Sequence, residues 1–459
     1  MTISRRELLR NSALTGAGIA LAGSLGPLLE SGFAAAKGPG GYGPLVPDPG
    51  GMLDLPAGFS YKVLYRAQAW STIGVTPSAL TTGEVAPNAA DGTGSFAGPR
   101  GGTILVQNKE CSPGDPGPVP HTVPTYDPAA AGGTTNLFID RQGNLVSHVA
   151  SLAGTTRNCA GGVTPWGTWL TCEETDATSG GVRHGYVFEV DPWGNDTAAV
   201  PLKGLGRFEH EALAIDPKKG DVYLTEDAST PNGLFYKFVP NDRRGRYGSL
   251  QAGGSLFAMK AGGLVDLSQV TDVGTSLDVT WVPVPNPDPD IAGGQPRVRS
   301  QFTADQITRS KKFEGAWWGH GRVWINCSFA KTAADVGGVG TPHEGQVWTY
   351  DPKRERLTLE VRFEPGGLFD GPDNITVSPH GGVFLAEDGD GDQYVIYIDK
   401  RNQAFAFAKN RIQFDGGFQE FTGPNFSPDG RFLFVNTQQP GITYAITGPW
   451  SGGRANGHR

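Results

Sequence analysis

In several separate parts of the chain, a residue able to bind a cation lies at the same distance before a turn. Each lies six residues before a Pro or His in the turn, and the set is Cys159, Glu211, Glu314, Asp373 and Thr422. A thiol and several carboxylates brought to one level of a fold would form a cation site. Carboxylate oxygens suit Ca²⁺ or Fe³⁺, whereas a thiolate among them favours a transition metal.

A second set of acids lies where the strand after each turn is expected to end. Its members are Glu110, Glu173, Glu174, Glu226, Asp227, Glu387 and Asp388. Carboxylates packed together repel one another unless cations or protons neutralise them. The alternative is that each acid caps a turn or pairs with a surface arginine, but turn capping gives no reason for a cysteine at the same offset.

Other residues carry weaker signals. The run Asp388, Asp390 and Asp392 resembles a calcium loop but lacks the glutamate that an EF-hand needs. His210 is expected to be structural, and the tryptophans, Trp169 among them, to pack between strands. The chain has no G-x-S-x-G, Walker A or H-E-x-x-H motif.

The elements that must position these residues recur along the chain. A turn with Pro and Gly precedes a strand of alternating apolar residues that ends in an acid or amide. Four clear copies and two looser ones span 163–174, 215–227, 377–388, 426–438, 97–110 and 316–328. Six such units predict an all-β fold, a six-bladed β-propeller with a metal site in its central channel. Strands at 59–65 and 442–446 would share the closing blade.

Two other all-β architectures are less compatible with this pattern. A pair of β-sandwiches does not explain six copies, and a β-helix needs a shorter repeat. The 459 residues include 68 Gly and 35 Pro, which favours one large domain with many turns, expected at residues 51–450.

The N-terminal region has the features of an export signal. Arg5 and Arg6 precede an apolar run that is broken by Gly and Ser, and three alanines follow at 34–36. This order predicts a twin-arginine signal peptide at residues 1–36 rather than a membrane span, and hence the twin-arginine export machinery as a partner. Residues 37–50 are expected to form a linker and 451–459 a tail. The expected location is periplasmic or extracellular.

Charge and cysteine usage narrow the partners further. The net charge is −8 and no Lys/Arg-rich run follows the signal, which argues against nucleic acid and anionic membranes as partners. The four cysteines are Cys111, Cys159, Cys172 and Cys327. A Cys159–Cys172 disulfide would close a hairpin-sized loop, but metal ligation or buried thiols are favoured over this bridge.

The segment NCAGGVTPWGTWLTCEE, residues 158–174, resembles the PhoX family of alkaline phosphatases. Short motifs over most of the chain support the resemblance, at residues 108–110, 209–212, 225–227, 313–315, 372–374, 386–388 and 422–425. The long motif is specific, and each short one is weak alone. The resemblance implies a six-bladed propeller that hydrolyses phosphomonoesters, as small-molecule substrates, at an iron–calcium centre outside the cytoplasm.

The same resemblance implies roles for individual residues. It assigns the iron side to Cys159, Glu174, Glu211 and Glu314, and the calcium side to Glu110, Asp373, Glu387 and Asp388. Lys312 or Arg157 would stabilise the charge of the phosphate. Two positions differ from the family pattern, because Lys109 replaces a histidine and Lys312 stands where an arginine is expected. Lysine supplies charge without the bidentate fork of arginine.

Two other functions compete with a phosphatase. A calcium-dependent propeller hydrolase of lactones or other esters would keep the carboxylates but has no use for the cysteine. A metal-stabilised propeller without catalysis would bind a partner instead. Iron content separates the first alternative from a phosphatase, and bound phosphate would count against the second.

Overall fold

The computed structural model describes residues 41–67 and 78–450, and this part of the chain consists almost entirely of β-strands. Its helices are short 3-10 turns, η1 (Pro99–Gly101), η2 (Lys203–Leu205), η3 (Ser249–Ala252), η4 (Leu267–Gln269) and η5 (Val298–Gln301). None of the helices in these residues is long and apolar enough to cross a membrane. The all-β prediction is therefore confirmed, whereas the predicted signal peptide and tail lie outside the described residues.

The strands form antiparallel sheets that follow one another along the chain. The first sheet contains β4 (Ala90–Ala97), β5 (Thr103–Lys109), β6 (Gly132–Ile139) and β7 (Leu145–Thr155). The second contains β8 (Asn158–Val163), β9 (Trp169–Glu173) and β12 (Val187–Val190). Short hairpins join β10 (Thr178–Ser179) to β11 (Val182–Arg183) and β27 (Gln413–Phe414) to β28 (Gly417–Phe418).

The longest sheet consists of two antiparallel series that pair at their outer strands. One series is β13 (His210–Ile215), β14 (Val222–Glu226), β15 (Gly233–Pro240), β16 (Gly254–Ala261) and β17 (Ser276–Pro283), with β18 (Arg309–Ser310) beside β15. The other is β19 (Phe313–Gly319), β20 (Arg322–Cys327), β21 (Gly345–Asp351) and β22 (Arg356–Phe363). The strands β17 and β22 join them.

Two sheets combine strands from both ends of the described chain. The strands β23 (Pro372–Val377), β24 (Val383–Glu387), β25 (Tyr394–Ile398) and β26 (Ala404–Asn410) continue into β2 (Leu53–Pro56) and β1 (Leu45–Val46). The strands β29 (Phe421–Phe426), β30 (Leu433–Thr437) and β31 (Ile442–Thr447) pair with β3 (Ser60–Arg66). The predicted pairing of an early with a late strand is confirmed. Part of the segment expected as a linker forms β1.

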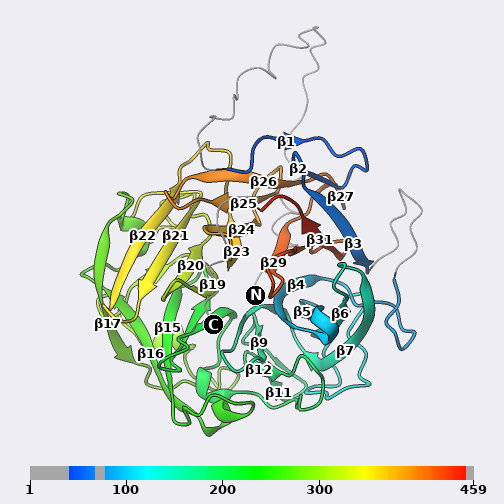
Figure 1. The fold of residues 1–459 in the computed structure, drawn as a ribbon. Coiled ribbons are helices and arrows are strands. Elements are labelled where there is room, and N and C mark those ends of the chain that lie inside the picture. Colours follow the sequence, from blue (N-terminus) through cyan, green and yellow to red (C-terminus); the bar gives the residue numbers. More distant parts are fainter. Residues whose placement is uncertain (1–40, 68–77, 451–459) are drawn as a thin grey trace, which may run out of the picture. The chain divides into compact units, whose positions relative to one another are not determined.

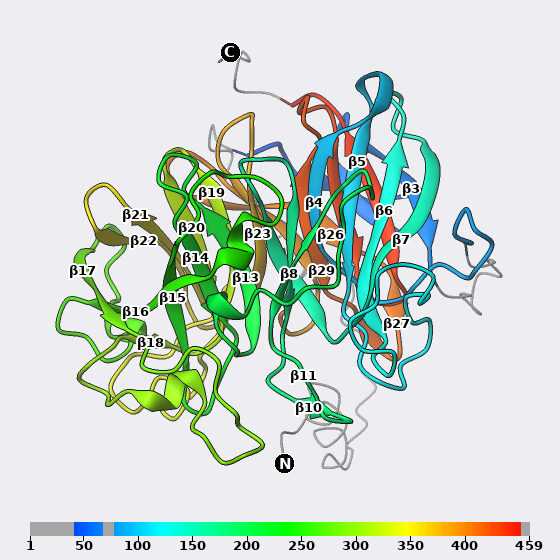
Figure 2. The same cartoon turned by 90° about the horizontal axis from the view of Figure 1, so that it is seen from below.

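The first strands of these series form a closed set of contacts. In order, β4 contacts β8, β8 contacts β13, β13 contacts β19, β19 contacts β23, β23 contacts β29, and β29 contacts β4. Figure 1 shows β4, β19, β23 and β29 near the centre and β7, β17, β22 and β26 further out, and Figure 2 shows β4, β8, β13 and β23 from the side. This arrangement is propeller-like.

The repeated apolar segments form the second strand of each series. Every residue of β9, β14, β24 and β30 is buried, because other sheets cover both faces of these strands. Apolar clusters fill the space between them, such as the one that joins β24 and β26 to β29–β31 around Phe384, Phe407 and Tyr444. This burial explains why the repeats read as nearly continuous apolar runs.

Each first strand carries a bulge near its start. In β8, Asn158 pairs with Glu173 and Gly161 with Thr171, so three steps on one strand match two on the other. The same shift follows the first residue of β4, β13, β19 and β23, and in β29 it follows the second residue, Thr422. A bulge leaves residues unpaired and redirects their side chains. The bulges therefore decide where the candidate ligands point.

Candidate metal centre

The second residue of each bulged strand belongs to one set of buried side chains. The set is Asp91, Cys159, Glu211, Glu314, Asp373 and Thr422, and each is at most 3% exposed. All but Asp91 come from the spacing found in the sequence. β4 has 8 residues and β8 has 6, so in β4 the same position lies further from its turn.

Amide side chains from the neighbouring sheet hold three of these bulges. Asn108 of β5 donates to the backbone oxygens of Cys159 (3.0 Å) and Ala160 (2.7 Å). Asn326 of β20 donates to Asp373 O at 2.7 Å, and Asn436 of β30 donates to Asp91 O at 3.0 Å. Buried carbonyls need such partners, because an unpaired one costs about 1–3 kcal/mol.

A second set of side chains follows the last residue of the second strands. It contains Glu110 after β5, Glu174 after β9, Asp227 after β14, Asp388 after β24 and Gln438 after β30. Gln438 donates to Glu110 Oε2 at 2.6 Å and to Asp91 Oδ2 at 2.9 Å. The two sets meet because the first and second strands of a series are antiparallel neighbours.

The two sets, together with Glu420, contribute to four groups, and within each group the ligand atoms lie within 4.8 Å of one another. The groups are Asp91, Glu110 and Cys159; Cys159, Glu174 and Glu211; Glu211, Asp227 and Glu314; and Asp373, Asp388 and Glu420. Shared members link the first three into a continuous series. The sulfur of Cys159 lies 3.1 Å from Glu211 Oε1 and 3.9 Å from Asp91 Oδ2.

Burial makes this concentration of acids unfavourable without a cation. Desolvation raises the pKa of Asp91, Glu211 and Cys159 well above their ordinary values, and the charges of neighbouring carboxylates raise them further. Asp91 Oδ1 and Glu211 Oε2 are buried and accept no hydrogen bond from the described residues. Oxygen donors with one thiolate match a transition metal beside harder cations, so the donor set fits the iron and calcium expected from the sequence.

Two cationic side chains, Arg157 and Lys312, lie against the acids. Arg157 Nη2 is 2.6 Å from Glu174 Oε2 and 3.3 Å from Glu110 Oε1. Lys312 Nζ is 2.8 Å from Glu314 Oε1 and 3.2 Å from Asp227 Oδ2. Each cation therefore bridges two of the acids that form the groups.

The backbone holds both cations in the same way. Arg157 precedes β8 and Lys312 precedes β19, with φ of 53° and 52°. This left-handed conformation is uncommon for residues other than glycine. Arg157 N donates to Cys111 O and its carbonyl accepts from Glu174 N, at 3.0 and 2.8 Å. Lys312 makes the equivalent bonds to Ala228 O and Ser328 N, both at 3.1 Å.

One predicted ligand, Glu387, lies outside the four groups. Its carboxylate accepts hydrogen bonds from Asp370 N at 2.7 Å and Tyr394 N at 2.8 Å. The group that contains Asp373 and Asp388 includes Glu420 instead. Glu420 directly precedes β29, as Arg157 precedes β8, so counting eight residues back from the turn would have found it.

Two other features considered from the sequence are a disulfide and a calcium loop. All four cysteines are buried thiols in the described chain, so no Cys159–Cys172 disulfide forms. Asp390 pairs with Lys331 at 2.8 Å and Asp392 with Lys409 at 2.6 Å, so these two acids of the predicted calcium loop have cationic partners.

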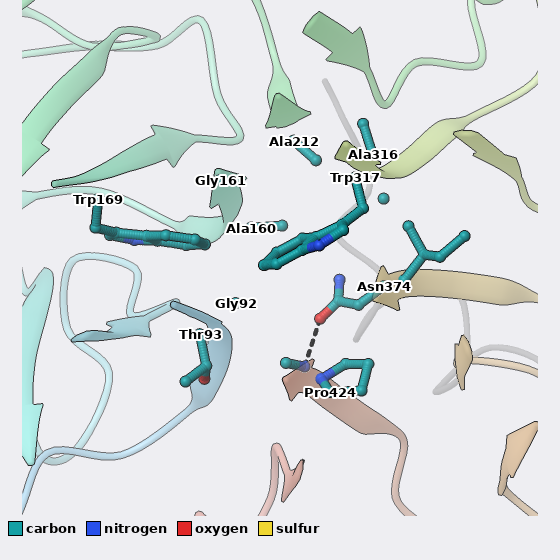
Figure 3. A pocket seen from close by; sticks show the side chains of 13 residues that line it. Gly92, Thr93, Ala160, Gly161, Trp169, Ala212, Ala316, Trp317, Asn374 and Pro424 are labelled. Carbon is teal, nitrogen blue, oxygen red and sulfur yellow. Dashed lines mark hydrogen bonds between the residues drawn. The ribbon is translucent and has the colours of Figure 1, made fainter. Parts of the chain in front are cut away.

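A pocket lies where the bulges approach one another. Small residues such as Gly92, Ala160 and Gly315 line it, together with Trp169 and Trp317. Figure 3 shows the two rings beside the bulge residues. A Cβ on Gly92 would lie 2.5 Å from Ala160 Cα, so the close approach of β4 and β8 requires glycine there.

The fold and the site together define an all-β protein of propeller-like arrangement with buried acids and a thiol grouped at its strand ends. The chain belongs to the alkaline phosphatase PhoX family, whose family model matches residues 40–151 and 144–441. This membership confirms the enzyme class expected from the sequence, a phosphoric monoester hydrolase. No curated protein matches the chain.

Three solved structures are similar to the chain to different degrees. The chain is similar to Pseudomonas fluorescens PhoX in complex with vanadate, a transition state analogue, with 18% identity, a TM-score of 0.67, and coverage of 90% of this chain and 99% of that one. A Dyadobacter fermentans protein of unknown function has 11% identity, a TM-score of 0.44, and coverage of 86% and 100%. A Xanthomonas campestris gluconolactonase has 13% identity, a TM-score of 0.35, and coverage of 79% and 97%.

Proposed function

We propose that this protein is an exported phosphatase that hydrolyses phosphomonoesters at an iron–calcium centre. The observation that carries the proposal is the place of Cys159, whose sulfur lies among buried carboxylates, 3.1 Å from Glu211 Oε1. A calcium-only site has no use for a thiolate, whereas a transition metal does. Family membership supports the reaction.

The proposed frame is a six-bladed propeller with the metal site in its central channel, formed by residues 51–450. Its support is the closed series of contacts among β4, β8, β13, β19, β23 and β29. Each of these strands has the same bulge, which is expected if each opens one blade. The four acids and the thiol at the second residue of five of these strands then share one end of the channel.

The proposed metal ligands fall into two sides. Iron would be held by Cys159, Glu174, Glu211 and Glu314, and calcium by Glu110, Asp373 and Asp388. We add Asp91 and Asp227 to the iron side, because their groups contain Cys159 and Glu211. We add Glu420 to the calcium side, because its group contains Asp373 and Asp388. We assign Glu387 to fixing the backbone beside Asp388.

Arg157 and Lys312 are the proposed phosphate-binding side chains. When bound, the metal ions supply Lewis-acid neutralisation of the phosphoryl charge. Arg157 is 27% exposed and Lys312 is 16% exposed, so both reach from the buried acids towards solvent. The guanidinium of Arg157 can hold two phosphate oxygens at once, and the ammonium of Lys312 adds a point charge.

Export is the remaining part of the proposal. Arg5 and Arg6 with the apolar run that follows support a twin-arginine signal at residues 1–36. Residues 37–50 and 451–459 are the proposed linker and tail. This route transports folded proteins, so the metal ions would be loaded before the protein reaches the periplasm or the exterior.

Phosphatase activity and metal content of two variants test the proposal. Cys159→Ser and Glu314→Gln are expected to lose most hydrolysis of p-nitrophenyl phosphate together with bound iron. Cys172→Ser is the matched control, because this thiol is equally buried and lies outside the four groups. Full activity with unchanged metal content in the two ligand variants would sink the proposal.

A further inference from the structure

A second pocket lies at the opposite end of the strands that carry the acids. It has a volume of about 430 Å³ and is lined by Phe96, Trp166, Trp193 and Tyr247 with Asp191 and Asp196. Phe96 is near the end of β4, whose second residue is Asp91. Five residues of strand at about 3.3 Å each separate the two by roughly 17 Å. The pocket is therefore distinct from the candidate metal centre.

A buried carboxylate fixes the walls of this pocket. Glu189 is 3% exposed, and its Oε1 accepts from Trp166 Nε1 at 2.7 Å and from Thr168 Oγ1 at 2.6 Å. Its Oε2 accepts from Gly248 N at 2.8 Å, next to Tyr247. The hydroxyl of Tyr247 accepts from Ala198 N at 2.8 Å. The rings of Trp166 and Tyr247 are thus held in place before any ligand arrives.

The charge of the pocket is negative. Its described lining contains Asp191 and Asp196 but no Lys, Arg or His, and Glu189 lies behind Trp166. Burial raises the pKa of Tyr247, and the charges of all three carboxylates add to the increase. Trp193 is 51% exposed, which leaves a large aromatic side chain open to solvent in the same lining as the two Asp residues.

We propose that this pocket binds an organic cation that carries a methylated ammonium group, such as a trimethylammonium. Aromatic faces attract such cations through the ring quadrupole, and the methyl groups pack on the rings. The carboxylates add charge complementarity. A sugar is a poorer match, because it needs donors as well as acceptors and the Trp166 and Thr168 donors are already bonded to Glu189.

Calorimetric titration of the metal-loaded protein tests the proposal. Choline is expected to bind saturably, and 3,3-dimethyl-1-butanol, its neutral isostere, is not. Trp193→Ala is expected to weaken choline binding about tenfold and Asp196→Asn several-fold, whereas Trp193→Phe keeps most of it. Hydrolysis of p-nitrophenyl phosphate should stay unchanged in all three variants, because the pocket is remote from the acids.

Three results would overturn the assignment: no saturable binding of choline, equal binding of the neutral alcohol, or choline binding that neither Trp193→Ala nor Asp196→Asn weakens. In the first case, saturable binding of glucose would assign the pocket to a sugar instead. Sedimentation with phosphatidylcholine vesicles, with free choline as competitor, distinguishes the sources of the group. Capture by vesicles assigns a lipid headgroup, and binding of choline alone assigns a soluble ligand.

Discussion

Neighbouring acids at the ends of β9, β14 and β24 have different environments. The last residues of these strands, Glu173, Glu226 and Glu387, have their carboxylates bonded within the protein. The acids that follow, Glu174, Asp227 and Asp388, all belong to the candidate metal groups. Successive side chains of a strand point to opposite sides, so one residue of sequence separates a structural carboxylate from a candidate ligand.

The structural carboxylates show how many partners a buried acid needs when no cation serves it. Glu173 accepts from the backbone N–H groups of Thr156, Gly185 and Tyr186 at 2.9, 2.8 and 3.1 Å. His184 Nδ1 lies 2.6 Å from its Oε1. Glu211, in contrast, has a buried oxygen with no hydrogen bond from the described residues. The difference indicates that a cation would do for a candidate ligand such as Glu211 what hydrogen-bond donors do for the structural carboxylate Glu173.

The largest effect is expected from Glu174→Gln. Removing one charge from the group of Cys159 and Glu211 should lower phosphatase activity about 100-fold or more, because loss of even an outer partner of a metal ligand costs about 10–100-fold. Activity and iron content of the purified variant are the measurements. Wild-type activity with normal iron would place Glu174 among the structural acids and break the comparison.

Glu226→Gln should lower the free energy of unfolding rather than remove a metal ligand. Arg299 Nη1 is 2.9 Å from Glu226 Oε1, and both side chains are buried. Breaking a buried ion pair costs about 3–5 kcal/mol; since Glu209 also pairs with Arg299, we expect about 3 kcal/mol in the free energy of unfolding. Urea denaturation after chelation measures it. Asp227→Asn should lower activity instead, because Asp227 shares a group with Glu211 and Glu314.

The free energy of unfolding is expected to depend on pH through His184, the partner of the structural carboxylate Glu173. Burial alone would lower its pKa, but hydrogen bonds and charge from Glu173 and Asp127 outweigh burial and raise it. The stability from protonated His184 is therefore full below its unfolded pKa of about 6.5 and is lost as pH rises through the higher folded pKa.

The free energy of unfolding should thus differ more between wild type and His184→Gln at about pH 5.5 than at about pH 8.5. His210→Gln should show the opposite trend, because burial lowers the pKa of His210 to about 3. Below about pH 6.5 only the unfolded state protonates this residue, so wild type loses stability relative to His210→Gln as the pH falls. Equal differences at both pH values for His184→Gln would show that its charge plays no part.

Asp390→Asn should have the smallest effect. The Asp390 side chain is 80% exposed and pairs with Lys331, and exposed pairs contribute about 0–1 kcal/mol. Melting temperature, activity and calcium content should all stay near wild type. A loss of calcium in this variant would restore the loop at residues 388–392 as a cation site and enlarge the set of ligands.

Much of this arrangement could be predicted from the sequence because it repeats. The apolar strands after the turns and the offset of Cys159, Glu211, Glu314 and Asp373 come directly from the repeat. What could not be predicted depends on local geometry. Asp91 was missed because β4 is longer than β8, and no spacing shows that the Glu387 carboxylate faces backbone N–H groups.

The outer parts of the fold depend on long-range pairing. The pairing of β17 with β22 and the addition of β2 and β1 to β26 join segments far apart in the chain. Such contacts follow from which apolar edges meet in space, and no motif in Ser276–Pro283 or Leu53–Pro56 encodes them. The role of the amides that hold the bulges, such as Asn108, could not be predicted for the same reason, because each bonds to a strand of a neighbouring sheet.

The most direct test is elemental analysis of wild-type protein folded in the cell, paired with a phosphomonoester assay before and after chelation. The account predicts bound iron and calcium, loss of activity when they are removed, and recovery only when both are restored. Undiminished hydrolysis of p-nitrophenyl phosphate by protein that contains neither metal would contradict it.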